Sequence, residues 1–304
     1  MFVAAKLSAM RVKLRTRRLK ASGGWASHAL NKEIPETNWD GVAKRLAAAA
    51  PGLGLRIDSL PVDFEQYAAF KSEFAPGRFY AVGYKDKKIL EHFIAHQLLD
   101  LRSGQVYIDV ASENSPYPAQ FRKRLGVEAY SQDLSYPPGK HGYTIGSGAD
   151  SIPVPPASVD AISLQCAFEH FANAVDIRFI REAARILKPG GRCIVVPLYI
   201  GGTHLNIVDP VLDHSWIQFD ENALPVGELD LGGTFERIYS PESLHRIVIP
   251  HIGLHYTLYR VHIPHSLLEA ADNVEAVLRI RYVLEIRKCD TYCEKDGTAM
   301  PLRP

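Results

Sequence analysis

Short apolar runs alternate with amphipathic segments over the second two thirds of the chain. Seven runs have the length and composition of buried strands, at residues 105–111, 126–131, 143–148, 159–165, 192–200, 255–263 and 281–288. Helical patterns separate several of them, most clearly through Ile177, Ile180, Ala184 and Leu187. Strands that alternate with helices form a parallel sheet covered on both faces. The pattern predicts an α/β fold with a doubly wound, mostly parallel, seven-stranded sheet.

The first hundred residues are dominated by helical patterns instead. We expect helices near residues 38–49, 64–74 and 85–101, with a short extended piece at 55–57. We therefore divide the chain into a basic N-terminal arm (1–34), a helical extension (35–104) and an α/β domain (105–304), and within this domain residues 201–243 form a long insert. An insert of that length in a compact domain is usually a lid or a binding loop.

Charge is balanced over the whole chain but not along it. The 304 residues include 35 Lys and Arg against 34 Asp and Glu, so no net field draws the molecule to nucleic acid. The first twenty residues, in contrast, contain seven basic residues and no acidic one, around an apolar stripe at helical spacing. That pattern is typical of helices that contact an anionic membrane surface and also of disordered tails, so both alternatives stay open.

Two further features concern the compartment. No stretch approaches the roughly 18 to 20 consecutive apolar residues of a membrane-spanning helix. The four cysteines are too few for a disulfide scaffold in a chain of 304 residues. We therefore expect a cytoplasmic protein.

Candidate binding residues lie where the predicted strands end. In an open α/β sheet, ligands bind beyond the carboxyl ends of the central strands, at the point where the strand order reverses. Asp109 falls at the end of the first of these strands, and a turn of mostly small residues follows it. Asp133 ends the next strand, close to the spacing of about 20 residues at which a carboxylate commonly binds a ribose diol.

These segments, taken in order, resemble a class I S-adenosylmethionine-dependent methyltransferase. YIDVASENS resembles the first motif of the family, QDLS the acidic second motif, and GADSIPVPPASVDAIS the segment that leads into the fourth strand. The closest match is EHFANAVDIRFIREAARILKPGGRCIVVP, which contains the Leu-Lys-Pro-Gly-Gly turn of the family in full at residues 187–191. The resemblance covers residues 105–288 and implies a Rossmann-like sheet with S-adenosylmethionine as cofactor. It places the cofactor against Asp109, Ala111, Ser112, Glu113, Asp133, Leu134, Ala149, Asp150 and Gln165.

One position departs from the family pattern. The first motif of the family alternates glycines, whereas this chain has Ala111, Glu113 and Ser115. Glutamate lacks the freedom of glycine at positive φ. Two alternatives follow: Glu113 is a buried carboxylate that contacts the ammonium or sulfonium of the cofactor, or the domain is a catalytically silent binding module.

The chemistry of methyl transfer requires few fixed residues. It is an in-line displacement, so alignment, desolvation and sometimes a base for the acceptor suffice. As bases we rank His170, beyond the fourth strand, before His204, in the insert. We expect a small-molecule acceptor that is methylated on oxygen, a hydroxyl or carboxylate of a metabolite or sugar, and no metal. A nucleotide-dependent oxidoreductase is disfavoured because no GxGxxG follows the first strand.

Overall fold

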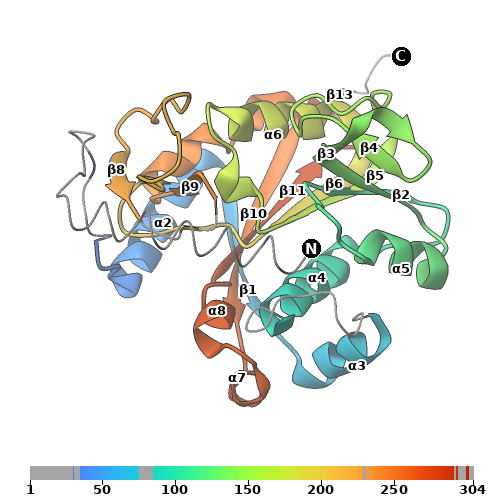
Figure 1. Ribbon diagram of the computed structural model, residues 1–304, viewed down its shortest axis with the longest axis horizontal. Helices are drawn as coiled ribbons and strands as arrows, with labels where there is room; N and C mark the ends of the chain where they lie inside the picture. The colour runs from blue at the N-terminus through green and yellow to red at the C-terminus, as the bar shows by residue number, and fades with distance from the viewer. Residues whose placement is uncertain are drawn as a thin grey trace.

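The computed structural model describes residues 30, 35–74, 85–228, 231, 233–290, 292–293 and 299–300. An eight-stranded sheet lies at its centre, with helices on both faces (Figure 1). Across the sheet the strands follow in the order β1 (Leu55–Pro61), β10 (Leu254–His262), β11 (Tyr282–Lys288), β6 (Leu187–Val196), β5 (Val159–Gln165), β2 (Val106–Val110), β3 (Glu128–His141) and β4 (Thr144–Gly146). The predicted membrane contact of the arm 1–34 concerns residues that, apart from residue 30, lie outside the described ones.

The strand order reverses between β2 and β5. From β2 the chain moves outward through β3 to β4, and it then returns to β5 and β6 on the other side of β2. These neighbouring strands pair in parallel, whereas β11 is antiparallel to both β6 and β10. The carboxyl ends of β2, β3 and β5 therefore meet at the switch point where ligands of open α/β sheets bind.

The predicted α/β class is confirmed, with one strand more than the seven expected. The additional strand, β1, pairs in parallel with β10 and comes from the segment assigned to the helical extension. Only Leu55 of this edge strand is buried, so its sequence lacks the continuous apolar run that marks an interior strand.

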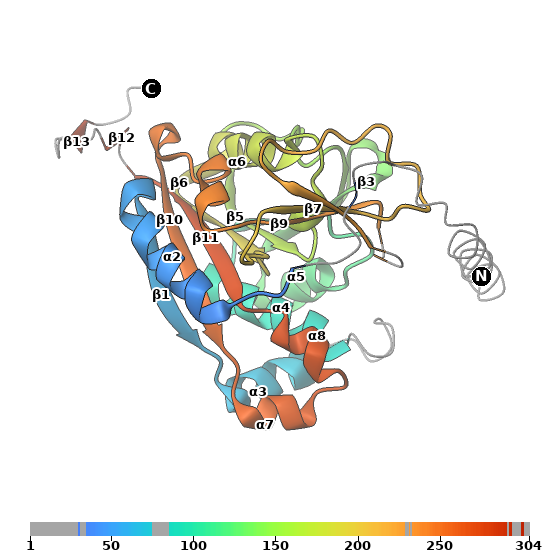
Figure 2. The ribbon, with the colours of Figure 1, turned by 90° about the vertical axis from the view of Figure 1, so that its left-hand side faces the viewer.

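Helices cover the two faces unequally. The helices are α2 (Trp39–Leu53), α3 (Phe64–Phe74), α4 (Lys85–Leu99), α5 (Tyr117–Leu125), α6 (Val175–Ile186), α7 (His265–Ala270) and α8 (Val274–Leu278). One apolar core contains side chains of α2 and α6, and the opposite core contains side chains of α3, α4, α5, α7 and α8. Figure 2 shows α2 alongside β1 and α3 near α7. The helical extension thus packs into both cores of the sheet.

The insert folds into a small sheet of its own. Its strands β7 (Leu205–Val208), β8 (Leu224–Gly227) and β9 (Phe235–Ile238) are arranged with β7 in the middle. The fully buried Arg237 guanidinium lies 2.6 Å from the Asp220 carboxylate and 3.4 Å from that of Asp176 in α6. These buried ion pairs attach the insert to α6.

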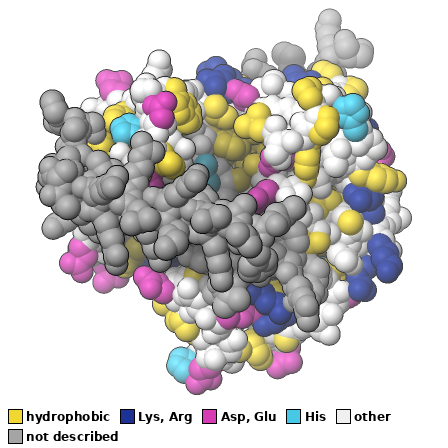
Figure 3. Space-filling view, viewed as in Figure 1, with side chains coloured by type: hydrophobic (Ala, Val, Ile, Leu, Met, Phe, Trp, Pro, Cys, Tyr) yellow, Lys and Arg dark blue, Asp and Glu magenta, His cyan; other side chains and the backbone are white. Residues whose placement is uncertain are grey.

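Shorter elements complete the described chain. Single turns of 3₁₀ helix occur at Phe168–His170, Glu242–Arg246 and Pro250–Ile252, and two-residue strands at Tyr292–Cys293 and Ala299–Met300. Among the described helices, none is both long and apolar enough to cross a membrane. On the face shown in Figure 3, basic and acidic side chains are both dispersed, as the balanced composition leads one to expect.

Candidate functional site

The turn after β2 keeps a glycine-type backbone without glycine. Ala111 has a φ of 51° and Glu113 a φ of 49°, both in the left-handed region. That conformation costs a residue with a Cβ roughly 1 to 2 kcal/mol. The amide of Ala111 donates to the Gln132 side chain at 3.1 Å, and the amide of Glu113 donates to the Asp133 carboxylate at 2.9 Å. Side chains of β3 therefore hold the turn in its strained shape.

Asp133 occupies the position predicted for a ribose ligand. One of its carboxylate oxygens accepts from the Glu113 amide, and the other accepts from the Ser135 amide at 2.8 Å. Each oxygen retains a second lone pair, so the carboxylate can also accept from hydroxyls. The next residue, Leu134, is 81% exposed and offers an apolar surface beside it. The ribose role of Asp133 stays a prediction.

A cavity of about 430 Å³ opens beside this turn; we call it the turn cavity. Its walls are formed by Lys88, His92, Asp109, Ala111, Ser112, Glu113, Asn114, Ser115, Gln165 and Cys166. Sequence reasoning found its strand-end members, because they follow β2 and β5. It missed Lys88 and His92, which come from α4 and lie outside the methyltransferase-like motifs. Asp133, Leu134, Ala149 and Asp150 are not in its wall; Ala149 is buried, and Asp150 binds Arg178 at 2.7 Å.

Asp109 is the unusual group of the turn cavity. Its side chain is fully buried, and the Ser115 hydroxyl and the Lys88 ammonium are the polar groups that act on its carboxylate. Burial raises the pKa of Asp109 to about 7, although the Ser115 hydroxyl and the Lys88 ammonium partly offset the effect. A buried carboxylate without a partner is costly unless a ligand supplies a cation or hydrogen-bond donors.

The expectation of a buried Glu113 is wrong. Glu113 is exposed, and the contacts that fix it involve its backbone: its amide donates to Asp133, and its carbonyl accepts from the Tyr136 hydroxyl. Water therefore solvates this carboxylate, which needs no cationic partner. The buried carboxylate of the turn belongs to Asp109 instead.

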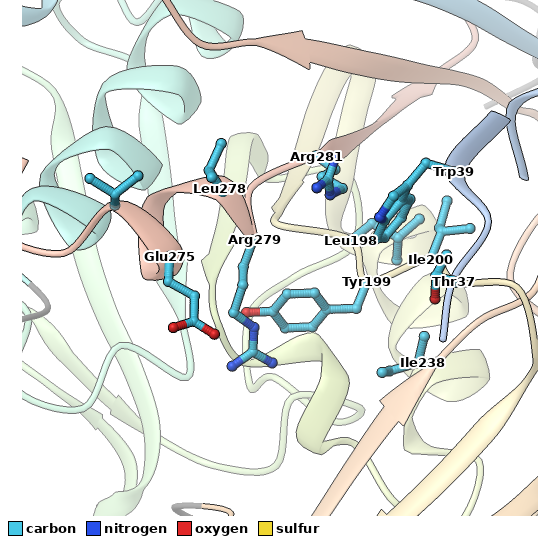
Figure 4. A pocket seen from close by; sticks show the side chains of 12 residues that line it. Thr37, Trp39, Leu198, Tyr199, Ile200, Ile238, Glu275, Leu278, Arg279 and Arg281 are labelled. Atoms are coloured by element: carbon cyan, nitrogen blue, oxygen red, sulfur yellow. The ribbon is translucent and has the colours of Figure 1, made fainter. Parts of the chain in front are cut away.

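A second cavity of about 570 Å³, the apolar cavity, lies beyond the end of β6. Figure 4 shows Tyr199 in its middle, with Arg279 and Leu278 on one side and Trp39 and Ile200 on the other. The remaining wall is formed by Thr37, Leu198, Gly201, Ile238, Val274, Glu275 and Arg281. Trp39, Val274 and Leu278 rank among the large hydrophobic residues of the described chain that stay exposed. Exposed apolar residues that gather around one cavity are typical of a binding site.

Tyr199 and Cys166 connect the two cavities. The Cys166 sulfur, in the wall of the turn cavity, lies 3.5 Å from the hydroxyl of Tyr199, in the wall of the apolar cavity. The Lys87 ammonium donates to both, at 2.8 Å to the sulfur and 3.2 Å to the hydroxyl. Burial raises the pKa of Cys166 to about 12, so the group between the cavities is a neutral thiol.

The two predicted bases lie in different surroundings. The Nδ1 atom of His170 lies 2.6 Å from the Phe235 carbonyl oxygen, and its Nε2 lies 3.8 Å from the buried Glu169 carboxylate. His204 is buried in the insert, where its Nε2 lies 3.2 Å from the Asp220 carboxylate. Neither histidine contributes to the wall of the turn cavity or of the apolar cavity. Their catalytic roles stay predictions without support from this geometry.

Comparison with known proteins identifies the domain. Residues 110–195, which contain the turn after β2, Asp133 and the Leu-Lys-Pro-Gly-Gly turn, match the family model of a methyltransferase domain. The chain contains a methyltransferase domain. S-adenosylmethionine is the cofactor of this methyltransferase. No curated protein matches the chain in sequence.

Several solved structures are similar in fold. A methyltransferase described as putative, in complex with the Haloferax volcanii Trm112 activator, is 19% identical, with 75% of this chain and 99% of that chain covered and a TM-score of 0.43. The Burkholderia thailandensis 1,6-didemethyltoxoflavin-N1-methyltransferase is 14% identical, with 86% and 94% covered and a TM-score of 0.45. A methyltransferase from Mesorhizobium loti is also 14% identical, with 65% and 98% covered and a TM-score of 0.45. Similarity at this level does not identify the acceptor of the present methyltransferase.

The turn cavity fits the methionine end of the cofactor. S-adenosylmethionine carries an ammonium, a carboxylate and a sulfonium at that end, and when bound it supplies the methyl group for transfer. Asp109 provides a buried carboxylate, the kind of partner that an ammonium requires. Gln165 and Cys166 lie at the end of β5 in the wall of this cavity. Cys166 contacts Tyr199, which is in the wall of the apolar cavity.

Proposed function

We propose that this methyltransferase methylates an oxygen of a small apolar acid, and that the acceptor binds in the apolar cavity. The observation that carries the proposal is the contact of Cys166 with Tyr199, which brings this cavity next to the turn cavity. Its volume of about 570 Å³ falls within the range of small-molecule sites. Leucine, isoleucine, valine and tryptophan side chains form half of its wall, which favours an acceptor with an apolar body.

Two arginines favour an acidic acceptor. The Arg279 guanidinium lies 4.9 Å from the centroid of the Tyr199 ring and donates to Glu236 at 2.9 Å. The Arg281 guanidinium lies 4.0 Å from the centroid of the Trp39 ring and has no ion pair with a described carboxylate. A guanidinium placed over an aromatic ring beside an apolar cavity can bind a carboxylate through two parallel hydrogen bonds.

A carboxylate acceptor also matches the absence of a base in the described wall of the apolar cavity. This wall contains no histidine, and its carboxylate, that of Glu275, is exposed. A hydroxyl must lose its proton in the reaction, whereas a carboxylate is already ionised at neutral pH. When the carboxylate attacks the methyl group, its negative charge and the positive charge of the sulfonium disappear together. Apolar surroundings favour such a step because they solvate the separated charges poorly.

Product analysis with matched variants tests the proposal. The protein is incubated with S-adenosylmethionine and a panel of apolar carboxylic acids, the corresponding alcohols and amines, and simple sugars, and methylated products are identified by mass spectrometry. We expect methyl esters of one or more acids. Trp39→Ala should lower kcat/KM for that acid by about tenfold or more without changing the affinity for the cofactor. Trp216→Ala is the matched control, because Trp216 is 54% exposed and lies in neither cavity wall.

Three results would overturn the proposal. Transfer to alcohols, amines or sugars with no transfer to any acid would assign another acceptor class to the enzyme. Cofactor binding with no product from the whole panel would favour the silent binding module. Equal losses in Trp39→Ala and Trp216→Ala would remove the acceptor from the apolar cavity.

A further inference from the structure

The strand β1 leaves one edge of the large sheet open. It pairs with β10 on one side, and no described strand pairs with its other side. Figure 2 shows β1 at the outer margin of the sheet, with α2 alongside it. An unpaired edge presents a row of N–H and C=O groups to which a strand of another chain can add. The residues of β1 line neither the turn cavity nor the apolar cavity, so this edge has no part in the proposed methyl transfer.

The backbone groups that face outward belong to the odd-numbered residues of β1. The amide of Val62 donates to the His262 carbonyl at 2.9 Å, and the pairing with β10 is regular along the whole strand. Since successive residues of a strand direct their N–H and C=O groups to opposite sides, the even-numbered residues face β10 and the odd-numbered ones face away. Pro61 occupies an outward position and has no N–H, as is usual for proline in an edge strand. The outward groups that can pair fully therefore lie between Leu55 and Ser59.

The charges of β1 are complementary to those of a second copy. Arg56 and Asp58 project to the same face of the sheet, where Arg56 donates to the Asp58 carboxylate at 2.9 Å. In an antiparallel pair centred on Ile57, Arg56 of each copy lies opposite Asp58 of the other. A pair centred on Arg56 would place two arginines opposite each other, and one centred on Asp58 would place two aspartates there, which is destabilising. Charges of one sign on an edge keep other strands away, but this pattern accepts its own copy in one register.

Apolar surface lies at the centre of the same register. Ile57 is 37% exposed and lines a groove of about 400 Å³ between α2 and the sheet. The α2 side of this groove includes Ala43, Ala47 and Pro51. Residues directly opposite each other in an antiparallel pair project to the same face, so Ile57 of the second copy would pack against Ile57 beside this groove. Pairing thereby removes apolar surface from water as well as joining backbone groups.

We infer that the protein forms a two-fold symmetric dimer in which β1 pairs antiparallel with β1 of a second copy, centred on Ile57. The two large sheets then form one continuous sheet. In this register the outward N–H and C=O groups of Leu55 pair with those of Ser59, and Ile57 pairs with itself. A two-fold interface must be self-complementary, and the sequence Arg56-Ile57-Asp58 meets that condition in charge and in apolar contact. The inference is independent of the cofactor and of the acceptor.

Sedimentation velocity of the full chain over a range of micromolar concentrations tests the dimer. We expect the native protein to dimerise reversibly. Arg56→Asp places aspartates opposite one another, and Asp58→Arg places arginines opposite one another, so each variant should raise the dissociation constant by about tenfold or more. Mixed in equal amounts, the two variants should associate about as tightly as the native protein, because each strand then meets opposite charges. Lys123→Asp, on the exposed side of α5, is the matched control and should keep the native dissociation constant.

The mixture separates pairing between copies from effects within one strand, since neither variant retains the Arg56–Asp58 ion pair. The double variant Arg56→Asp/Asp58→Arg restores both pairs across the interface and should dimerise like the native protein. A native protein that stays monomeric at the highest concentration would overturn the inference. So would a dimer that both single variants leave unchanged, which would assign association to another surface. Variants that stay apart when mixed, together with a double variant that stays monomeric, would also overturn it.

Discussion

Replacing Asp109 with asparagine should stabilise the ligand-free protein and weaken its binding of the cofactor. Asp109 is fully buried, and burial outweighs the Ser115 hydroxyl and the Lys88 ammonium and raises its pKa from 3.8 to about 7. Because the folded form holds the proton more tightly than the unfolded chain, the folded state loses stability as pH rises from about 4 to about 7. The loss is complete above pH 7 and absent below pH 4.

The magnitude follows from the gap between these two pKa values. At about 1.4 kcal/mol for each pKa unit, the ionised carboxylate costs the folded state up to roughly 4 kcal/mol at pH 8. The side-chain amide introduced by the substitution also stays without a partner, which costs about 1 to 2 kcal/mol. We therefore expect Asp109→Asn to raise the free energy of unfolding by about 2 to 3 kcal/mol at pH 8 and to give no gain at pH 4.

Urea unfolding from pH 4 to pH 8.5, together with calorimetry of cofactor binding at pH 8, checks both effects. The affinity for S-adenosylmethionine should fall by about 10- to 100-fold, since the charged hydrogen bond to its ammonium is lost. Asp100→Asn is a suitable control because Asp100 has a side chain that is 63% exposed. A variant that is less stable than the native protein at pH 8, or whose stability difference is the same at all pH values, would refute the reasoning.

Three further predictions concern the turn and the insert. Asp133→Ala should weaken cofactor binding by about 1.5 to 3 kcal/mol, and unchanged affinity in calorimetry of a folded variant would remove the ribose assignment. Glu113→Gly should raise the free energy of unfolding by about 1 kcal/mol, because the φ of 49° at this position strains glutamate but not glycine. A large loss of cofactor affinity in this variant would show that the exposed carboxylate binds the cofactor. His204→Gln should keep methyl transfer within about threefold of the native rate, because His204 lies in neither cavity wall. A rate loss of about a hundredfold at an unchanged melting temperature would instead support its predicted role as a base.

The sheet was predictable where its strands are buried on both faces. In β2, Ile108 and Val110 belong to one core and Tyr107 to the other, so the strand has a continuous apolar run. The edge strand β1 has no such run, because Leu55 is its one buried residue. Its pairing with β10 joins positions 201 residues apart, as in the pair Leu55 and Tyr256, which no local pattern encodes.

The candidate site was predictable to the extent that it lies at strand ends. Asp109 and Gln165 follow buried runs, and parallel strands place their carboxyl ends along one edge. Lys88 and His92 were not predicted, because their place in the wall of the turn cavity depends on how α4 packs over that edge. The structure buries Lys87, Glu91 and His92 together with the apolar residues of α4. Charged residues inside an apolar stripe are costly to bury, and they mark a helix whose partners include more than a core.

The position of Glu113 shows why one side chain in a motif is a weak guide to binding. In the left-handed conformation at Glu113, the backbone contacts Asp133 and Tyr136 while the side chain stays in water. A missing glycine therefore costs strain of roughly 1 to 2 kcal/mol but leaves the shape of the turn intact. A buried carboxylate such as that of Asp109 contributes more than that strain when a cationic group of a ligand pairs with it. Where such charges face the ligand, the turn after the first strand can lose its glycines and still serve as one wall of the cofactor site.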